Sequence, residues 1–416
     1  MDTALSDADL RAALFSVYGE LGNRRRVIGL PPDFTRLNSR AGPLTCQTYE
    51  YFGDALTDVM PALGTHVPMT PAQLDRMYPG LPHSLIREHR WREDVVTVGE
   101  VSAEFVRNVT DGVWERPWPA QMNKLIWEGG HDLIVSIGQV VPHEVIGMAN
   151  YNKNLFVGTG GAAGINESHF IGAACGMERM MGRANTPLRL ILNSAQDQFC
   201  AHLPLLYVLT VVGSNADGDL VTRGLFIGDD HSTFERAAHL AAEVNFTQLE
   251  TPLDNVVVYL DPEEFHTTWL GNKSIYRTRM AMADSGRLTV LAPGVSGFGE
   301  DAVIDALSRR YGYRTTPEIM AALEANADLQ DNLSAAAHLI HGSSEGRFEV
   351  VYSPGGLSRE EIEGVGYEYG DLDAALGRYG APDLRDGRQT TADGESFYFI
   401  GNPALGLWAA RAPMGG

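Results

Sequence analysis

Residues 131–141 read HDLIVSIGQVV, a short apolar run that predicts a buried strand. Working outward, three more runs of this kind predict strands at residues 25–34, 188–194 and 203–213. Between the first two strands, residues 46–63 have the spacing of a helix. Strands that alternate with helices form βαβ units, so the sequence predicts an α/β fold with a mostly parallel sheet.

A second set of strands and helices begins at residues 254–262, DNVVVYLDP, and continues through the helix-like residues 274–286. We therefore expect two α/β domains with mostly parallel sheets, and an active site in the cleft between them. The expected boundaries are 1–250 for the N-terminal domain and 251–385 for the C-terminal domain. The apolar tail, residues 386–416, is expected to return and pack on the N-terminal domain.

Composition and charge narrow the class of protein. The 416 residues carry a formal net charge of −21, which argues against a nucleic-acid or membrane partner because phosphate groups require a basic surface. Cys46, Cys175 and Cys200 are too few and too far apart for a disulfide framework or a structural zinc site. The acidic N-terminus does not resemble a signal peptide, and no apolar run approaches the roughly 18 residues of a membrane span. We expect a cytoplasmic enzyme.

Polar residues follow several of the predicted strands directly. DFTR occupies residues 33–36, PHE residues 142–144, and DPEEFH residues 261–266. Sites of open parallel sheets form at the carboxyl ends of the strands, so these segments are candidates for chemistry.

Two loops contain candidate polar groups in the first domain. Arg36 can offer its planar guanidinium to a substrate carboxylate, or it can pair with Asp33 at the surface while Asp33 caps the turn. His66, framed by Gly64 and Pro68, suits proton transfer. It is equally typical of a loop histidine that is bonded to backbone.

A third group of candidates lies close together in the sequence. His143 follows the stiff Pro142, and Lys153 is a candidate nucleophile or covalent anchor. The glycine-rich residues 158–164, GTGGAAG, offer backbone N–H groups to a phosphate, although they match neither a Walker loop nor a dinucleotide fingerprint. His169, on the helix expected next, is a candidate metal ligand or a core residue.

In the second domain, residues 265–279 read FHTTWLGNKSIYRTR and gather polar and basic side chains at a helix start. This pattern is typical of anion capture at a helix N-terminus or of a solvated basic face. The side chains concerned are His266, Trp269, Asn272, Lys273, Arg277 and Arg279.

Taken together, these segments resemble the nickel-dependent lactate racemase family. Three motifs of that family appear in chain order, strongly over the first 250 residues and loosely in the second domain. They are Asp33, Thr35 and Arg36; Gly64, Thr65, His66, Pro68, Met69 and Thr70; and Pro142 with His143, Lys153 and His169.

The resemblance implies a nickel-pincer nucleotide, a pyridinium mononucleotide whose sulfur-bearing arms clamp Ni(II), supplied by cofactor-biosynthesis proteins. It assigns Lys153 as the covalent tether and His169 as a nickel ligand, a sulfur and imidazole set that suits Ni(II). Asp33 and Thr35 are implied as cofactor-binding residues. The glycine loop then provides N–H donors for the cofactor phosphate, through Gly158, Thr159, Gly160 and Gly161.

The implied reaction inverts C2 of a 2-hydroxy acid through reversible hydride transfer to the cofactor. His66 and His143 act as acid and base on the two faces, and Arg36 holds the substrate carboxylate. Lys273 and Trp269 are expected substrate contacts of the second domain.

The second domain departs from the lactate-type pattern, because Lys273 has no matching glutamine partner. A pocket with Asn, Lys, Arg and Trp favours a larger acid, such as a sugar acid of the gluconate type, over lactate or another short-chain acid. Two other classes are alternatives. A nicotinamide-dependent oxidoreductase predicts a G-x-G-x-x-G fingerprint directly after the first strand and an acidic residue about twenty positions further on, and neither is present. A hydroxy-acid-binding protein without cofactor is disfavoured because it has no use for the lysine and the histidines.

Overall fold

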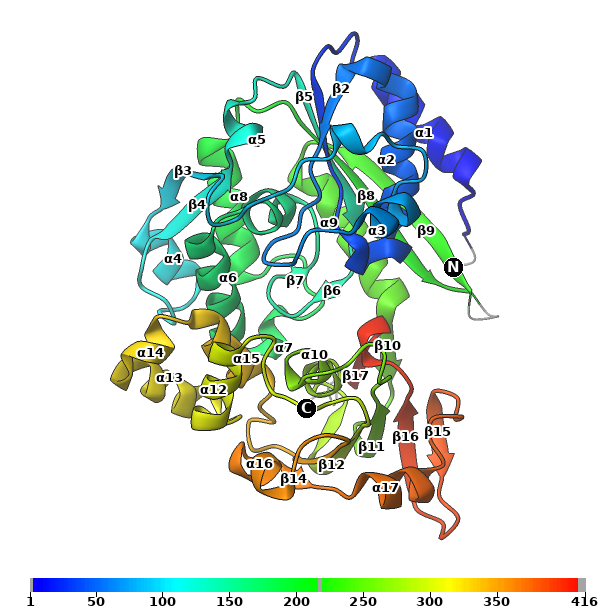
Figure 1. Cartoon of the computed structure of the whole chain (residues 1–416), viewed down its shortest axis with the longest axis vertical. Helices are drawn as coiled ribbons and strands as arrows, with labels where there is room; N and C mark the ends of the chain where they lie inside the picture. Colours follow the sequence, from blue (N-terminus) through cyan, green and yellow to red (C-terminus); the bar gives the residue numbers. More distant parts are fainter. Residues whose placement is uncertain (1–2, 216–218, 411–416) are drawn as a thin grey trace, which may run out of the picture. The chain divides into compact units, whose positions relative to one another are not determined.

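The computed structural model describes residues 3–215 and 219–410, which form two compact units (Figure 1). Unit 1 comprises the described residues up to Cys175 together with Arg179–Asn245. Unit 2 comprises Gly176–Glu178 and the described residues from Phe246 onward. Each unit has a mainly parallel sheet with helices, so the predicted class of two α/β domains is confirmed.

Unit 1 is built on a five-stranded sheet in the order β2-β1-β5-β8-β9. The first four strands are parallel and β9 is antiparallel to β8. Because β2, β1 and β5 are parallel neighbours, the loops that follow them emerge at the same edge of the sheet. The strands are β1 (Val27–Leu30), β2 (Leu56–Val59), β5 (Leu133–Gln139), β8 (Leu205–Ser214) and β9 (Leu220–Gly228).

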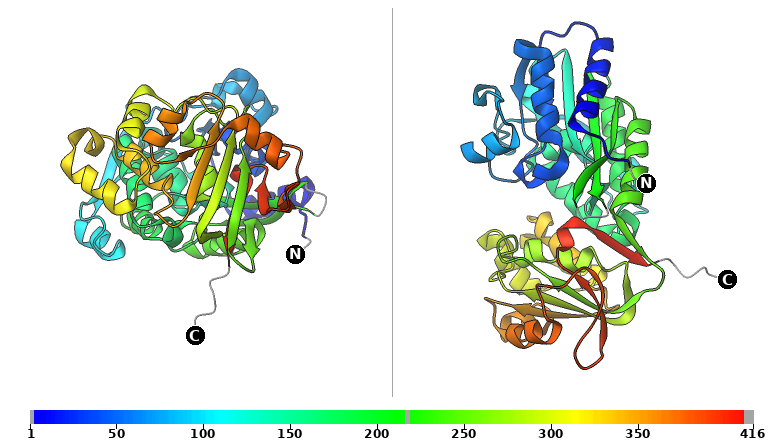
Figure 2. Two further views of the ribbon diagram at one scale, coloured as in Figure 1. Left: turned by 90° about the horizontal axis from the view of Figure 1, so that it is seen from below. Right: turned by 90° about the vertical axis from the view of Figure 1, so that its right-hand side faces the viewer.

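The two faces of this sheet are covered by different helices (Figures 1 and 2). On one face, Val135 and Val208 belong to a core that includes Leu14 of α1 (Asp7–Glu20) and Leu44 of α2 (Ala41–Phe52). The other face carries Tyr207, whose ring lies 4.2 Å from that of Tyr151. Tyr151 in turn stacks at 5.1 Å on Phe234 of α9 (His231–Asn245). Alternate strand residues therefore serve opposite layers.

Smaller elements complete unit 1. Two short antiparallel pairs flank the main sheet, β3 (Val95–Val101) with β4 (Trp118–Asn123) and β6 (Pro142–His143) with β7 (Gly147–Met148). The remaining helices and helical turns are η1 (Phe34–Ser39), η2 (Gly53–Ala55), α3 (Pro71–Met77), η3 (His83–Leu85), α4 (Ala103–Val109), α5 (Lys124–Glu128), η4 (Asn154–Gly158), α6 (Ala162–Ala174) and α8 (Pro187–Phe199). Helix α7 (Met177–Met180) lies where the two units divide.

The strand predicted at residues 188–194 is wrong, because this segment lies within α8. Thr186 caps the helix by accepting the Arg189 backbone N–H, and Pro187 occupies the first turn, where its missing N–H costs nothing. The apolar positions recur at helical spacing and are buried, namely Leu188, Ile191, Leu192 and Ala195.

The helix predicted over residues 46–63 is too long at its C-terminal end. Helix α2 ends at Phe52, and Gly53 follows with φ 52°, a conformation that a residue with a Cβ rarely adopts. The chain then makes the turn η2 and enters β2.

Unit 2 has a six-stranded sheet in the order β14-β13-β12-β11-β16-β15 (Figure 1). All neighbours are parallel except β15 and β16, which pair antiparallel at one edge. The strands are β11 (Leu253–Tyr259), β12 (Met282–Ala292), β13 (Glu349–Pro354), β14 (Glu368–Tyr369), β15 (Gly387–Thr390) and β16 (Ser396–Ile400).

Two segments of unit 2 differ from the sequence expectation. Strands β15 and β16, which lie within the tail expected to pack on the N-terminal domain, pair within the unit 2 sheet. Further along that tail, β17 (Leu407–Ala410) pairs with β10 (Phe246–Leu249) of the same unit, and residues 411–416 lie outside the described residues. Of the residues 274–286 that were expected to form a helix, only the first few are helical, as part of α11 (Lys273–Tyr276). The last few already belong to β12, which begins at Met282.

The helices of unit 2 lie between β11 and the antiparallel pair β15–β16, and one further helical turn, η5, follows that pair. They are α10 (Thr268–Gly271), α11 (Lys273–Tyr276), α12 (Ala302–Tyr311), α13 (Thr316–Ala325), α14 (Ala327–Gln330), α15 (Leu333–His341), α16 (Arg359–Gly364), α17 (Leu372–Tyr379) and the turn η5 (Pro403–Leu405). Across residues 3–215 and 219–410, no helix combines the length and apolar character that crossing a membrane requires.

Candidate functional site

Three loops of unit 1 converge at the carboxyl edge of β2, β1 and β5. The loops after β1 and β2 stay paired beyond the strands, since the Ala62 N–H donates to the Pro31 carbonyl at 2.7 Å. Asp33 lies just beyond Pro31 on one loop, and His66 lies a few residues beyond Ala62 on the other. The loop after β5 contains His143. The sheet thus brings together side chains that are more than 100 residues apart in sequence.

Asp33 and His66 form a hydrogen-bonded pair in which Nδ1 of His66 lies 2.6 Å from Oδ2 of Asp33. Asp33 is buried, with 5% of its surface exposed, whereas the His66 side chain is 55% exposed. The carboxylate accepts a hydrogen bond from Nδ1–H, so in the neutral ring Nε2 has a lone pair that can accept a proton.

The Asp33 carboxylate is stabilised in its charged form. Burial alone raises its pKa, but hydrogen bonds from His66 and from the Thr35 hydroxyl, together with the charge of Arg36, lower it below its usual value. The Thr35 hydroxyl donates to the second carboxylate oxygen at 2.5 Å. Asp33 is therefore an anion that orients His66 rather than a solvated turn cap.

His143 lies on the short hairpin that β6 and β7 form, with 7% of its surface exposed. The backbone N–H of Val145 donates to its Nδ1 at 3.1 Å. Because Nδ1 accepts a hydrogen bond, the neutral ring carries its proton on Nε2. Oε2 of the adjacent Glu144 lies 3.9 Å from Nδ1. His143 is thus set in the tautomer opposite to that of His66.

Lys153 follows an unusual turn of the backbone. Asn150 and Tyr151 both adopt left-handed conformations, with φ of 68° and 62°, and the chain continues from Lys153 into the π-helical turn η4. The side chain retains some exposed surface, but its amine lies deep enough to be desolvated. Desolvation, with the nearby positive charges of Arg36 and Arg189, lowers the Lys153 pKa to about 8.

Arg189, which belongs to no recognisable sequence motif, supports this turn. It lies on α8 with its side chain fully buried, and burial lowers its pKa to about 9. Its guanidinium donates to the carbonyl of Met148 at 2.7 Å, to that of Asn150 at 3.2 Å, and to the side-chain oxygen of Asn152. Sequence reasoning missed this residue because it predicted a strand here. The helix α8 is what places the Arg189 side chain against the turn.

The glycine loop is held close to the His66 loop. The Gly64 N–H donates to the Gly158 carbonyl at 2.8 Å, and a Cβ added at Gly158 would lie 2.7 Å from the Cβ of Ala62. His89, another residue that sequence reasoning missed, bonds the Gly160 carbonyl at 3.0 Å. The Thr159 N–H and hydroxyl both bond the carbonyl of Asn154 within the turn.

His169 lies on α6. It is about two helical turns beyond Gly161, which caps the N-terminus of that helix. Its Nδ1 donates to the Ile165 carbonyl at 2.7 Å, which leaves the Nε2 lone pair available to a metal. Burial lowers the His169 pKa, and the charges of Lys153 and His66 lower it further. The ring is therefore neutral at physiological pH, and it lies near enough to Lys153 for the charge of that amine to affect its pKa.

Lys273 and Trp269, the expected substrate contacts of the second domain, belong to unit 2. Trp269 is half-buried on α10, and its ring lies 4.7 Å from that of His338. The Lys273 ammonium lies 5.7 Å from the centre of the Phe265 ring. These contacts tie both residues to the surrounding core.

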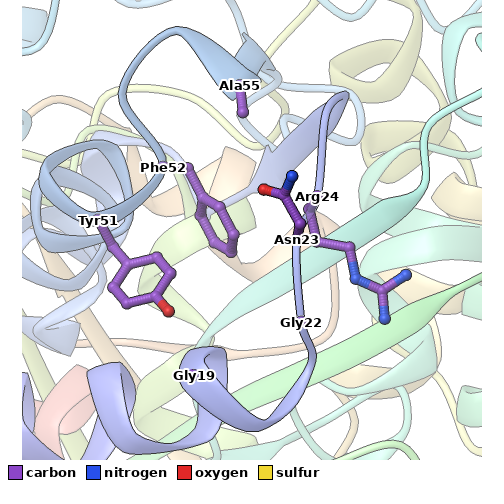
Figure 3. A pocket seen from close by; sticks show the side chains of 7 residues that line it. All are labelled: Gly19, Gly22, Asn23, Arg24, Tyr51, Phe52 and Ala55. Carbon is purple, nitrogen blue, oxygen red and sulfur yellow. The ribbon is translucent and has the colours of Figure 1, made fainter.

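A pocket of unit 1 lies elsewhere, beside the residues that precede β1 and β2 (Figure 3). It faces the amino ends of these strands, whereas sites of parallel sheets form at the carboxyl ends. Its lining is Gly19, Gly22, Asn23, Arg24, Tyr51, Phe52 and Ala55. Among the residues that the structure describes, no group of three or more His, Cys, Asp or Glu side chains is arranged to hold a metal ion.

Comparison with known proteins supports the fold. No protein-family model and no curated protein matches the sequence. A crystal structure of a protein from Thermotoga maritima matches with a TM-score of 0.79 and 21% identity, over 98% of this chain and 99% of that one. The lactate racemase apoprotein from Thermoanaerobacterium thermosaccharolyticum matches with a TM-score of 0.72 and 14% identity, over 99% and 94% of the respective chains. The chain therefore has a lactate racemase-like fold.

Proposed function

We propose that this chain is a racemase or epimerase that inverts C2 of a 2-hydroxy acid with a nickel-pincer nucleotide tethered to Lys153. One observation carries the proposal. In a chain of lactate racemase-like fold, Lys153 and His169 lie close enough that the charge of one lowers the pKa of the other. The Asp33–His66 pair and His143 project from the same edge of the sheet. In this proposal unit 1 is the cofactor-binding and catalytic domain.

The residues present fit this cofactor. An amine with a pKa near 8 is partly unprotonated at physiological pH, as a covalent attachment through nitrogen requires. His169 offers Nε2, and imidazole with sulfur ligands suits Ni(II). When bound, the nickel-pincer nucleotide supplies a hydride acceptor and donor for C2 of the substrate. Gly160 and Gly161 remain our candidates for the phosphate, because the Thr159 donors are used within the turn.

The two histidines have complementary proton states. Nε2 of His66, whose partner Asp33 holds Nδ1–H, accepts the substrate hydroxyl proton from one face. Nε2–H of His143, fixed by the Val145 N–H, returns a proton to the oxygen from the other face. Asp33 stabilises the imidazolium that forms on His66. The reverse reaction uses the same two groups in exchanged roles.

Arg36 is our candidate for holding the substrate carboxylate. Bidentate pairing fixes the carboxylate while the rest of the substrate turns to present its other face. Lys273 and Trp269 of unit 2 remain candidates for contacts with the substrate chain. Because polar and basic residues surround Lys273 in sequence, we favour a polyhydroxy acid of the gluconate type over lactate or another short-chain acid.

The test uses protein produced together with the cofactor-biosynthesis proteins and a set of single-enantiomer 2-hydroxy acids deuterated at C2. The proposal predicts a product with inverted C2 that retains deuterium in ordinary water, because a hydride does not exchange with solvent. Inversion with loss of deuterium to water would replace hydride transfer by proton abstraction. Saturable binding of an acid without any inversion would favour a hydroxy-acid-binding protein instead.

A further inference from the structure

The segment that leads to Lys153 is held by a buried cation. Arg189 on α8 is fully buried, and its guanidinium donates to oxygens of Met148, Asn150 and Asn152. The charged plane lies 4.2 Å from the centre of the Phe234 ring, which fixes its orientation. A planar fork that meets three acceptors in one segment constrains the path of that segment.

The same segment is clamped from a second position on α8. The Asn152 side chain donates through Nδ2 to Oδ1 of Asn193 at 2.7 Å, while its own oxygen accepts from Arg189. Arg189 and Asn193 are one helical turn apart and thus hold Asn152 from both sides. Between Met148 and Asn152 the backbone passes through two consecutive left-handed residues, Asn150 and Tyr151, which persist only where surrounding contacts impose them.

We propose that Arg189 is a positioning residue that holds the Met148–Asn152 segment, so that the Lys153 amine is kept desolvated and directed into the site before any cofactor binds. The purpose of this arrangement rests on the proposed function, in which Lys153 is the attachment point. Two effects of Arg189 act in the same direction. It keeps the amine away from solvent, and its positive charge opposes protonation of the nearby lysine.

The chain offers a direct readout because it contains only three lysines, Lys124, Lys153 and Lys273. Protein labelled with ¹³C at the lysine Cε gives three resonances, whose titration reports the pKa of each amine. The measurement uses the full chain without nickel or cofactor. It is therefore independent of whether the cofactor proposal holds, which the search for a covalent adduct tests separately.

Two variants are compared with the wild-type chain. Arg189→Lys keeps the charge but loses the planar fork, and Asn152→Ala removes one acceptor while leaving Arg189 in place. We expect both to raise the Lys153 pKa above about 8, by on the order of 1 unit, while Lys124 and Lys273 titrate as before. Gln198→Ala, an exposed position on the same helix, is the control and should leave all three titrations unchanged.

A wild-type titration of Lys153 in both folded variants would overturn the proposal. A shift in Asn152→Ala with a wild-type value in Arg189→Lys would also overturn it, because charge alone would then suffice. Should Arg189→Lys fail to fold, Asn152→Ala is compared with Asn193→Ala, which removes only the Asn193 bond and leaves every Arg189 bond in place. A shift of equal size in these two variants would overturn the proposal. Thermal unfolding of each variant establishes that the titrated chain is native.

Discussion

Nδ1 of His66 lies 2.6 Å from the buried Oδ2 of Asp33, and the two residues follow the neighbouring parallel strands β2 and β1. The short distance is a consequence of sheet order, because loops that leave adjacent strands at one edge meet. It fixes the tautomer of an otherwise exposed ring. A histidine whose lone pair direction is set by a buried carboxylate is prepared to accept a proton.

Replacing Asp33 by Asn should remove the carboxylate that fixes the tautomer of His66, while preserving the shape of the side chain. We expect kcat to fall by about 10²-fold or more, the lower part of the usual range for general acid–base catalysis, with a smaller change in KM. Epimerisation kinetics of the cofactor-loaded enzyme measure this. Asp75→Asn, which breaks an exposed pair with His83, is the matched control and should keep full activity. Equal activities of the two variants would remove Asp33 from the mechanism.

His169→Ala should abolish nickel retention, because it removes the imidazole whose Nε2 is left free by the bond to Ile165. Metal analysis of protein produced with the cofactor pathway measures nickel per chain. His239 is exposed, with 80% of its side-chain surface accessible, so His239→Ala should retain nickel as the wild-type chain does. Full nickel content in His169→Ala would show that another residue binds the metal.

The reactivity of Lys153 should depend on pH in a characteristic way. Only the unprotonated amine attacks an acylating reagent, so its acylation rate should rise with pH through about 8 and then level off. Peptide mass spectrometry after brief acylation of the cofactor-free chain measures each lysine separately, with Lys124 as the internal comparison. If the Lys153 rate were still rising steeply near pH 10, its amine would not be desolvated.

The same depressed pKa predicts a change in stability. Between about 8 and the ordinary lysine value near 10.4, the unfolded chain binds a proton at Lys153 that the folded chain lacks. The contribution of Lys153 to the free energy of unfolding should therefore increase as the pH rises across this interval. Chemical unfolding of the wild-type chain and of Lys153→Met at about pH 7.5 and about pH 9.5 measures this contribution. The difference between the two chains should shift in favour of the wild type at the higher pH.

Gly158→Ala tests the close approach of the glycine loop to the His66 loop. The added Cβ would lie 2.7 Å from the Cβ of Ala62, so the loops must separate, and we expect a loss of about 1–3 kcal/mol in the free energy of unfolding. At Gly377, in α17, nothing lies within 4 Å of an added Cβ. Gly377→Ala should instead gain about 0.5–1 kcal/mol. Thermal or denaturant unfolding compares the two.

The sequence was most informative where a segment has one apolar face or is apolar throughout. The runs that became β1, β5, β8 and β11 were visible because strands buried on both faces contain few polar residues. Helix α8 was mistaken for a strand because LRLILNS is apolar over a short window. Its helical identity depends on the Thr186 cap and on packing outside that window.

The candidate site was predictable to the extent that it lies in motifs. Asp33, His66, His143, Lys153 and His169 were chosen from short patterns, and their roles stay predictions. Residues that act through distant contacts gave no such signal. Arg189 bonds a segment some 40 residues away in sequence, and such a contact exists only once α8 and the β6–β7 hairpin are assembled.

Intact-protein mass combined with nickel analysis, on chain produced together with the cofactor-biosynthesis proteins, tests the tether and the metal together. We expect a covalent adduct and about one nickel per chain, because one lysine tethers one cofactor and one histidine completes its metal site. Both should be lost in Lys153→Ala and kept in Lys124→Ala. An unmodified mass without nickel in the wild-type chain, under conditions that load a lactate racemase produced in parallel, would contradict it.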